Sequence, residues 1–101
     1  MDKYKDNRGR YIKPGDVLVY DEGPGYGQSI DLVVERDGEL CGVTMVGEPK
    51  WTVLEEEESI PLRFYKLYTS DKNMVTHNAY VVDVPHEEAF TPEFAERVFG
   101  R

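Results

Sequence analysis

The chain has 101 residues, of which 40 % are hydrophobic and 32 % are charged, and its formal net charge at pH 7 is −8. This length suits one domain, so a two-domain enzyme, a Rossmann dehydrogenase and a TIM barrel do not fit it. The single cysteine, Cys41, excludes an internal disulfide, and no apolar run reaches the roughly 18 residues of a membrane span. The N-terminus has no apolar segment typical of a secretory signal, so we expect a cytoplasmic protein.

The charge is unevenly distributed along the chain. Residues 1–13 carry five basic and two acidic side chains, whereas residues 14–101 carry seven basic and eighteen acidic ones. We expect residues 1–10 to form a basic, poorly ordered N-terminal arm and residues 11–101 to form a single β-rich domain. An acidic domain repels phosphate backbones and anionic lipid headgroups and attracts basic protein surfaces.

The first predicted elements are strands joined by turns. Pro14-Gly15-Asp16 is a turn pattern, residues 17–20 read as a strand, and residues 21–29 form a glycine-rich loop. Asp37-Gly38 between two apolar runs supplies the positive φ values of a type I′ turn and predicts a hairpin. The hairpin strands are residues 30–36 and 40–46. The later predicted strands are residues 51–54, residues 60–62 resuming into 63–68, and one strand over residues 74–76 and 79–84 with an interruption near His77-Asn78.

The pattern changes at the C-terminal end. Thr91 as N-cap, Pro92 at the first helical position and Glu93 in the first turn predict a helix that Gly100 ends. A helix of about two turns must dock on the sheet to be stable. The predicted fold is therefore mainly β: a small antiparallel β-barrel or strongly curved sheet of five to six strands, with one short C-terminal helix at an open end.

Residues 14–27 carry a Gly-Asp pair, alternating apolar residues and a glycine-bearing loop. This segment resembles the opening of KOW-type, SH3-like small barrels. The resemblance implies a small barrel fold. KOW modules that bind RNA usually carry lysine or arginine in the loop, whereas this loop carries Asp21 and Glu22. The resemblance therefore does not extend to nucleic-acid binding.

Reactive side chains occur without a recognisable catalytic or metal pattern. Cys41, His77 and Asp83 have the residue types of a nucleophile, a base and an orienting acid, but the apolar strand around Cys41 favours a buried filler. The histidines and the neighbouring acids lack metal-site spacing. The glycine-rich loop lacks the lysine of a phosphate-binding loop. We expect no catalytic residue, no metal and no cofactor. The residues considered for a metal are His77, Asp83, His86, Glu87 and Glu88.

Acidic and aromatic side chains are the candidate partner-binding residues. Four consecutive glutamates repel one another, so they are either a solvated, solubilising loop or a contact for basic groups on a partner. Tyrosine flanked by glycine is typical of recognition loops, and the aromatics of residues 63–68 cannot all fit inside a barrel. The predicted set is Asp21, Glu22, Tyr26, Glu55, Glu56, Glu57, Glu58 and Tyr65.

These features favour a non-catalytic, acidic protein-binding domain. The leading hypothesis is an inhibitor, of the toxin-immunity or phage anti-defence type, that covers a basic site on a partner protein such as a nuclease or another nucleic-acid-handling enzyme. The alternative is an SH3-like adaptor or accessory subunit that binds through the glycine-rich loop and exposed aromatics. An enzyme using Cys41 and nucleic-acid binding through residues 3–13 are less favoured hypotheses. We expect no membrane partner, and a homodimer through an exposed edge strand stays open.

Overall fold

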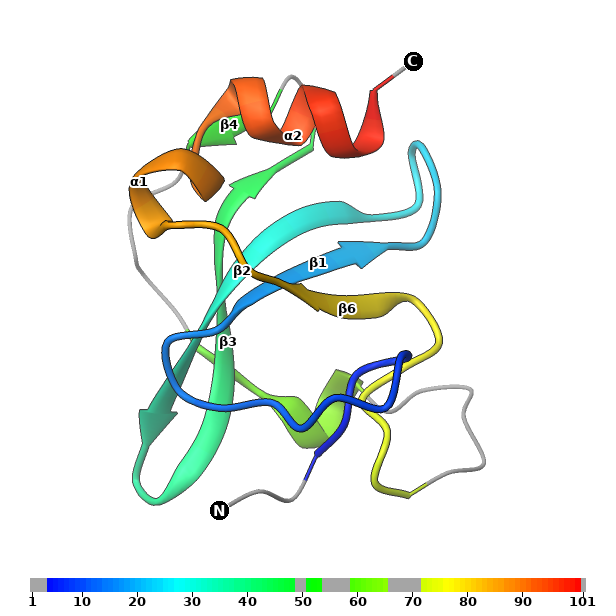
Figure 1. The fold of residues 1–101 in the computed structure, drawn as a ribbon. Coiled ribbons are helices and arrows are strands. Elements are labelled where there is room, and N and C mark those ends of the chain that lie inside the picture. The colour runs from blue at the N-terminus through cyan, green and yellow to red at the C-terminus, as the bar shows by residue number, and fades with distance from the viewer. Residues whose placement is uncertain (1–3, 49–50, 54–58, 66–71, 101) are drawn as a thin grey trace.

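The chain forms one curved antiparallel sheet with a helix at one end (Figure 1). The computed structural model describes residues 4–48, 51–53, 59–65 and 72–100. The sheet runs in the order β4-β3-β2-β1-β6, and β5 also pairs with β3. The strands are β1 (Val17–Asp21), β2 (Gln28–Arg36), β3 (Glu39–Gly47), β4 (Thr52–Val53), β5 (Ile60–Pro61) and β6 (Ala79–Val82).

The sheet is open. Its terminal strands are β4 and β6, and no pairing joins them within the described part of the chain. The predicted fold class, a mainly β protein with five to six antiparallel strands and a short C-terminal helix, is confirmed. Of the two predicted forms, the structure shows the curved sheet and not the closed barrel.

The long hairpin of β2 and β3 is confirmed together with its turn. Asp37 has φ 53° and Gly38 has φ 77°, so both central residues are left-handed, as a type I′ turn requires. Arg36 pairs with Glu39 directly across the turn. A local signal of two residues therefore sets the pairing of the two longest strands.

The prediction of a strand over residues 63–68 is wrong for its described part. Leu62–Tyr65 is instead a short 3-10 helix, η1, and residues 66–68 lie outside the described residues. Aromatic content favours a strand, but Leu62 is fully buried here and Tyr65 packs against the same core. These tertiary contacts outweigh the local preference.

The C-terminal helix α2 (Pro92–Phe99) is confirmed. The Thr91 side chain caps it by accepting a hydrogen bond from the backbone N–H of Phe94 at 3.2 Å. The residues between β6 and α2 include a single helical turn, α1 (His86–Ala89). α2 and η1 lie at opposite ends of the sheet (Figure 1). No helix in the described ranges is long and apolar enough to cross a membrane.

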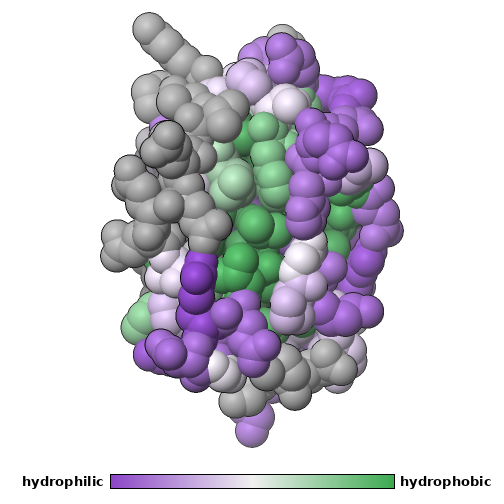
Figure 2. Space-filling view, turned by 90° about the vertical axis from the view of Figure 1, so that its left-hand side faces the viewer, coloured by the Kyte–Doolittle hydropathy of each residue, from purple (hydrophilic) through white to green (hydrophobic). Residues whose placement is uncertain are grey.

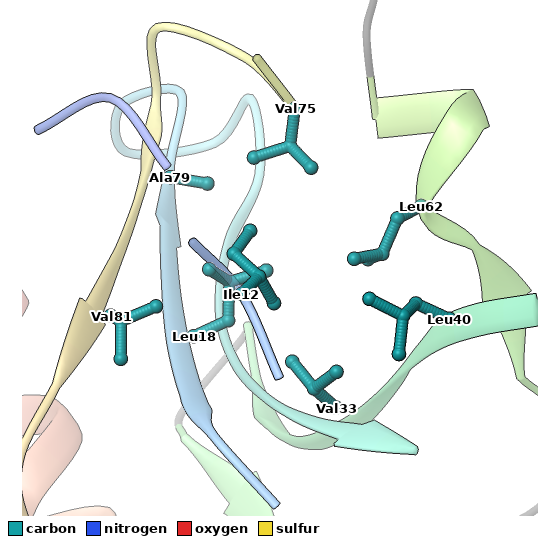
Figure 3. Close-up of a cluster of buried hydrophobic side chains, with 8 residues drawn as sticks. All are labelled: Ile12, Leu18, Val33, Leu40, Leu62, Val75, Ala79 and Val81. Carbon is teal, nitrogen blue, oxygen red and sulfur yellow. The ribbon is translucent and has the colours of Figure 1, made fainter. Parts of the chain in front are cut away.

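Two clusters of buried side chains hold the sheet. Leu18 of β1 belongs to the first cluster, whereas its neighbours Val17 and Val19 belong to the second, so β1 buries both of its faces. The first cluster gathers side chains from the N-terminal segment, the sheet and η1, which point toward one another in Figure 3. The second lies under α2. Figure 2 shows hydrophobic side chains along the middle of one face, with hydrophilic ones to the right and below.

The N-terminal segment covers the free edge of β6. The backbone N–H of Asn7 donates to the carbonyl of Ala79 at 2.9 Å, and Lys5 exchanges backbone hydrogen bonds with Asn73 and Val75. We expected residues 1–10 to be a poorly ordered arm; the structure places residues 4–10 against the body. This contact protects an edge that could otherwise pair with another strand.

Asp6 fixes this segment to the sheet. Its side chain is buried, with 1 % exposed. Oδ2 accepts a hydrogen bond from the backbone N–H of Val81 at 2.8 Å, and Oδ1 accepts from the backbone N–H groups of Arg8 and Arg10, both at 2.9 Å. One carboxylate thus pairs three backbone donors across 75 residues of sequence.

We predict that Asp6→Ala lowers the free energy of unfolding by about 2–4 kcal/mol, because it leaves these donors unpaired. Urea unfolding followed by circular dichroism measures this loss. The matched control is Asp83→Ala, since Asp83 is exposed and pairs with Arg10 at 2.7 Å on the surface. Equal losses in the two variants would contradict the structural role of Asp6.

Candidate functional site

A pocket of about 240 Å³ opens between the strands and η1. Its polar base comes from β2 and β3, and its aromatic walls come from β1 and η1. The lining residues carry two carboxylates and no basic side chain. They are Tyr20, Glu22, Ser29, Asp31, Thr44, Ile60, Phe64, Tyr65 and Thr76.

A β-bulge places Asp31 in this pocket. Ile30 pairs with Val46 and Asp31 pairs with Thr44, so Met45 is the extra residue of β3. Asp31 follows the fully buried Ile30, yet it is itself only 2 % exposed. Strand alternation points the two side chains to opposite faces of the sheet. The carboxylate is therefore buried on the face that η1 covers.

The Asp31 carboxylate is only half satisfied. Oδ2 accepts a hydrogen bond from the Tyr65 hydroxyl at 2.9 Å. Oδ1 is buried and has no hydrogen-bond partner among the described residues. Burial raises the pKa of Asp31, and the hydroxyls of Ser29, Tyr65 and Thr44 oppose this rise. A buried acceptor without a donor costs free energy, so the site favours a ligand that supplies one.

The Tyr65 hydroxyl is a permanent donor in this arrangement. Burial, followed by the nearby Asp31 charge, raises the pKa of Tyr65, so its proton stays in place across the working pH range. Its ring meets the Tyr20 ring edge-on, with centroids 6.0 Å apart and an interplanar angle of 81°. The two rings form adjoining walls of the pocket.

Gly42 makes room for Tyr65. A Cβ at this position would lie 2.9 Å from Cζ of Tyr65 and nearer still to its hydroxyl oxygen. Gly42 lies in the middle of β3 and pairs with Val33 and Ile60. The absence of a side chain therefore lets the Tyr65 ring cross β3 and reach Asp31.

The rim of the pocket is apolar and exposed. Ile60 is 46 % exposed and Phe64 is 57 % exposed, and both line the pocket. Arg63 pairs with Glu39 and holds η1 to β3 beside them. Large apolar side chains around a partly buried polar centre are typical of protein-contact surfaces.

The structure brings together two of the eight predicted partner-binding residues. Glu22 and Tyr65 both line the pocket. Asp21 is instead engaged within its own loop, where Oδ1 accepts hydrogen bonds from the Gly23 backbone at 2.9 Å and the Gln28 side chain at 2.8 Å. Tyr26 stands at the tip of that loop and is 82 % exposed. The prediction for Glu55, Glu56, Glu57 and Glu58 lies outside the described residues.

Sequence reasoning missed Asp31, the central residue of the pocket. A signal existed, because Asp31 is the one charged residue within the apolar run from Ile30 to Val34. Strand alternation places Asp31 on one face together with Val33 and Glu35, and that placement does not reveal its burial. The hydroxyls of Ser29 and Thr44 carried no signal of their own.

The residues considered for catalysis or metal binding have other contacts. Asp83 forms two hydrogen bonds with Arg10, which lower the pKa of its carboxyl group. A ring nitrogen of His86 lies 2.7 Å from the carbonyl oxygen of Gly15. Cys41 is buried and its thiol contacts the carbonyl of Glu39. Within the described ranges, no three His, Cys, Asp or Glu side chains gather as a metal site would need.

Comparisons with protein-family models, with curated proteins and with solved structures found no match to this chain. The resemblance of residues 14–27 to KOW-type barrels stays a prediction. The geometry of the pocket is therefore the main indication of function.

We predict that Gly42→Ala lowers the free energy of unfolding by about 1–3 kcal/mol, because the new methyl group displaces the Tyr65 ring. The control is the same substitution in a Tyr65→Ala background, where the methyl group meets no ring and the loss should be small. Denaturant unfolding of the wild type, the two single variants and the double variant gives the coupling free energy between positions 42 and 65. A loss that is equal in both backgrounds would show that Gly42 acts independently of Tyr65.

We also predict a pH-dependent difference in stability between the wild type and Asp31→Asn. With a raised pKa, folded Asp31 keeps a proton that the unfolded chain has lost, so increasing pH favours unfolding. The effect begins near the ordinary pKa of about 4 and reaches at most about 1.4 kcal/mol per pH unit until the raised pKa is passed.

Asp31→Asn should therefore gain stability relative to the wild type as the pH rises above the ordinary pKa of about 4, as measured by urea unfolding at each pH. The control is Glu22→Gln, which removes the exposed carboxylate of the same pocket. If the advantage of Asp31→Asn did not grow with pH, the burial of an ionisable Asp31 would be contradicted.

Proposed function

We propose that this chain is a non-catalytic binding domain that covers a basic site on a partner protein and inhibits it. The Asp31 pocket with its apolar rim is the proposed contact surface. The proposal keeps the partner expected from the sequence, a nuclease or another nucleic-acid-handling enzyme in the cytoplasm, in a toxin-immunity or anti-defence setting. Such enzymes bind phosphates through basic surfaces, which an acidic domain can occupy.

The unpaired Oδ1 of Asp31 is the observation that carries this proposal. A buried carboxylate oxygen without a donor destabilises the free domain, and none of the described residues donates a hydrogen bond to this atom. A bound ligand could supply the missing donor. In a purely structural role, both oxygens would be paired, as those of Asp6 are. The arrangement therefore favours binding of a donor, and the surrounding charge favours a basic one.

The rim supplies the apolar part of a protein contact. Phe64 and Ile60 present exposed apolar surface directly beside the polar centre. Interfaces combine buried aromatic anchors with a few desolvated polar groups, and a few such residues carry most of the binding free energy. Phe64 is the anchor that we propose on this side of the interface.

The charge of the whole chain supports the same class of partner. The formal net charge is −8, and the glutamate run at 55–58 precedes the rim residue Ile60 closely in sequence. Such a charge accelerates encounters with a basic surface, and this electrostatic attraction weakens as salt is added. The charge thus supplies the on-rate, and the pocket supplies the specific contact.

The exposed Tyr26 favours a second candidate function. With 82 % of its surface exposed at the tip of a glycine-rich loop, it suits an adaptor that docks through this loop. This candidate predicts weak salt dependence, because its contact is aromatic. It also predicts that changes in the Asp31 pocket leave binding intact.

We predict that immobilised wild-type protein captures one stoichiometric basic partner from native lysate, and that Asp31→Asn and Phe64→Ala each lose it. Changing Glu55, Glu56, Glu57 and Glu58 to Gln should lower the salt concentration that elutes the partner, because this change removes four negative charges. The measurement is capture over a salt gradient, followed by the partner's own reaction with and without the protein.

The matched control is Tyr26→Ala, which changes an exposed aromatic residue that does not line the pocket. Loss of the partner with Tyr26→Ala, together with retention by Asp31→Asn, would replace the inhibitor proposal with the adaptor. Capture of a partner whose activity is unchanged would remove the inhibitory part of the proposal.

A further inference from the structure

We propose that the Asp31 pocket receives a single lysine side chain of the partner protein, with the ammonium group hydrogen-bonded to Oδ1 of Asp31. This inference rests on the proposed function and names the chemical group that the site selects. Three features of the pocket support it: its charge, its free acceptor atoms and its shape.

The pocket selects a cation. Of the nine residues that line it, Asp31 and Glu22 are acidic and none is basic. Oδ1 of Asp31 is a buried acceptor with no donor among the described residues. Burial alone favours the protonated form of Asp31, and a cationic donor favours the ionised form, so such a donor would satisfy Oδ1 and compensate the carboxylate charge together. A neutral donor would do only the first.

The geometry favours an ammonium over a guanidinium. Arginine recognises a carboxylate best through two parallel hydrogen bonds, one to each oxygen. Here Oδ2 is already bonded to the Tyr65 hydroxyl at 2.9 Å, so Oδ1 alone is free. An ammonium is a compact charge that needs no paired oxygens, and it can use a single one.

Other acceptors lie beside Asp31. The hydroxyls of Ser29 and Thr44 line the pocket and interact with the carboxylate, and the Thr76 side chain is a further lining residue. A hydroxyl that donates its proton to the carboxylate keeps its lone pairs and can accept a hydrogen bond at the same time. Oδ1 and two hydroxyls thus match the three donors of an ammonium group.

The walls suit the aliphatic part of lysine. Tyr20 and Tyr65 meet at 81° and form an aromatic corner, which attracts a cation through the ring faces and packs against methylene groups. The pocket volume of about 240 Å³ exceeds the roughly 150 Å³ of a cavity that holds benzene. A four-carbon stem therefore has room.

Binding requires a small movement of the lining. Oδ1 is closed to solvent in this conformation, so an ammonium reaches it only after a side chain rotates. Changes of rotamer without backbone movement are common when protein surfaces associate. Phe64 and Ile60 at the rim are exposed and have space to rotate.

The test is a titration of the full chain with Nα-acetyl-lysine methylamide, followed by the NMR shifts of the Ser29, Asp31 and Thr44 amides. We expect saturable binding at millimolar concentration, and binding weaker by about 10- to 100-fold in Asp31→Asn. The norleucine analogue keeps the aliphatic stem and lacks the ammonium. It should bind the wild type no more tightly than the lysine analogue binds Asp31→Asn. Equal binding of the lysine and norleucine analogues would overturn the proposal.

A second comparison tests the choice of lysine over arginine. The wild type should bind the lysine analogue more tightly than Nα-acetyl-arginine methylamide. Tyr65→Phe frees Oδ2, so the lysine-to-arginine ratio of affinities should fall several-fold in that variant. Preference for arginine in the wild type, or an unchanged ratio in Tyr65→Phe, would contradict the assigned geometry.

These measurements distinguish a failure of the lysine assignment from a failure of the proposed function. If Asp31→Asn loses the captured partner but the lysine analogue does not bind the wild type, the protein contact stands and the lysine assignment fails. If free n-butylamine binds as tightly as a lysine-containing peptide, the site takes small amines, and the commitment to a partner's lysine is overturned. Binding of the peptide at least tenfold tighter than n-butylamine supports it.

Discussion

The hydrogen bond between Tyr65 and Asp31 is the interaction on which the site depends. It joins η1 to β2 across 34 residues of sequence and satisfies one of two buried carboxylate oxygens. Three features of the chain make it possible: the bulge that opposes Asp31 to Thr44, the missing side chain at Gly42, and the turn of η1. A regular sheet would need none of these three features, so the pocket results from specific residues of the chain and not from loop packing alone.

The two buried aspartates of the protein give an internal comparison. Asp6 and Asp31 are 1 % and 2 % exposed, so both lose nearly all contact with water. Asp6 recovers this loss through three backbone donors. Asp31 recovers only part of it through the hydroxyls of Ser29, Tyr65 and Thr44, because its Oδ1 stays unpaired among the described residues. A fully paired carboxylate stabilises the fold around it. A half-paired one in a pocket is a cost to the free domain that a ligand could offset, and this cost is the basis for proposing a binding site there.

The parts of the fold that could be predicted from sequence are those set by neighbouring residues. Asp37-Gly38 determines the hairpin turn, and Thr91-Pro92 determines the start of α2, because each acts within one turn of chain. η1 and the pocket could not be predicted in this way. They depend on the burial of Leu62 and on the contact of Tyr65 with a distant strand, and both outweigh the strand preference of aromatic residues.

The net charge and the pocket act over different distances, and they therefore have separate roles in the proposed function. A net charge of −8 acts over about a Debye length, roughly 8 Å at physiological salt, and attracts any basic surface. It cannot distinguish lysine from arginine or one basic protein from another. The Asp31 pocket acts only on contact and offers one free oxygen, two aromatic walls and an apolar rim. In the proposed function, selectivity therefore comes from the pocket, and the net negative charge determines how fast a basic partner arrives.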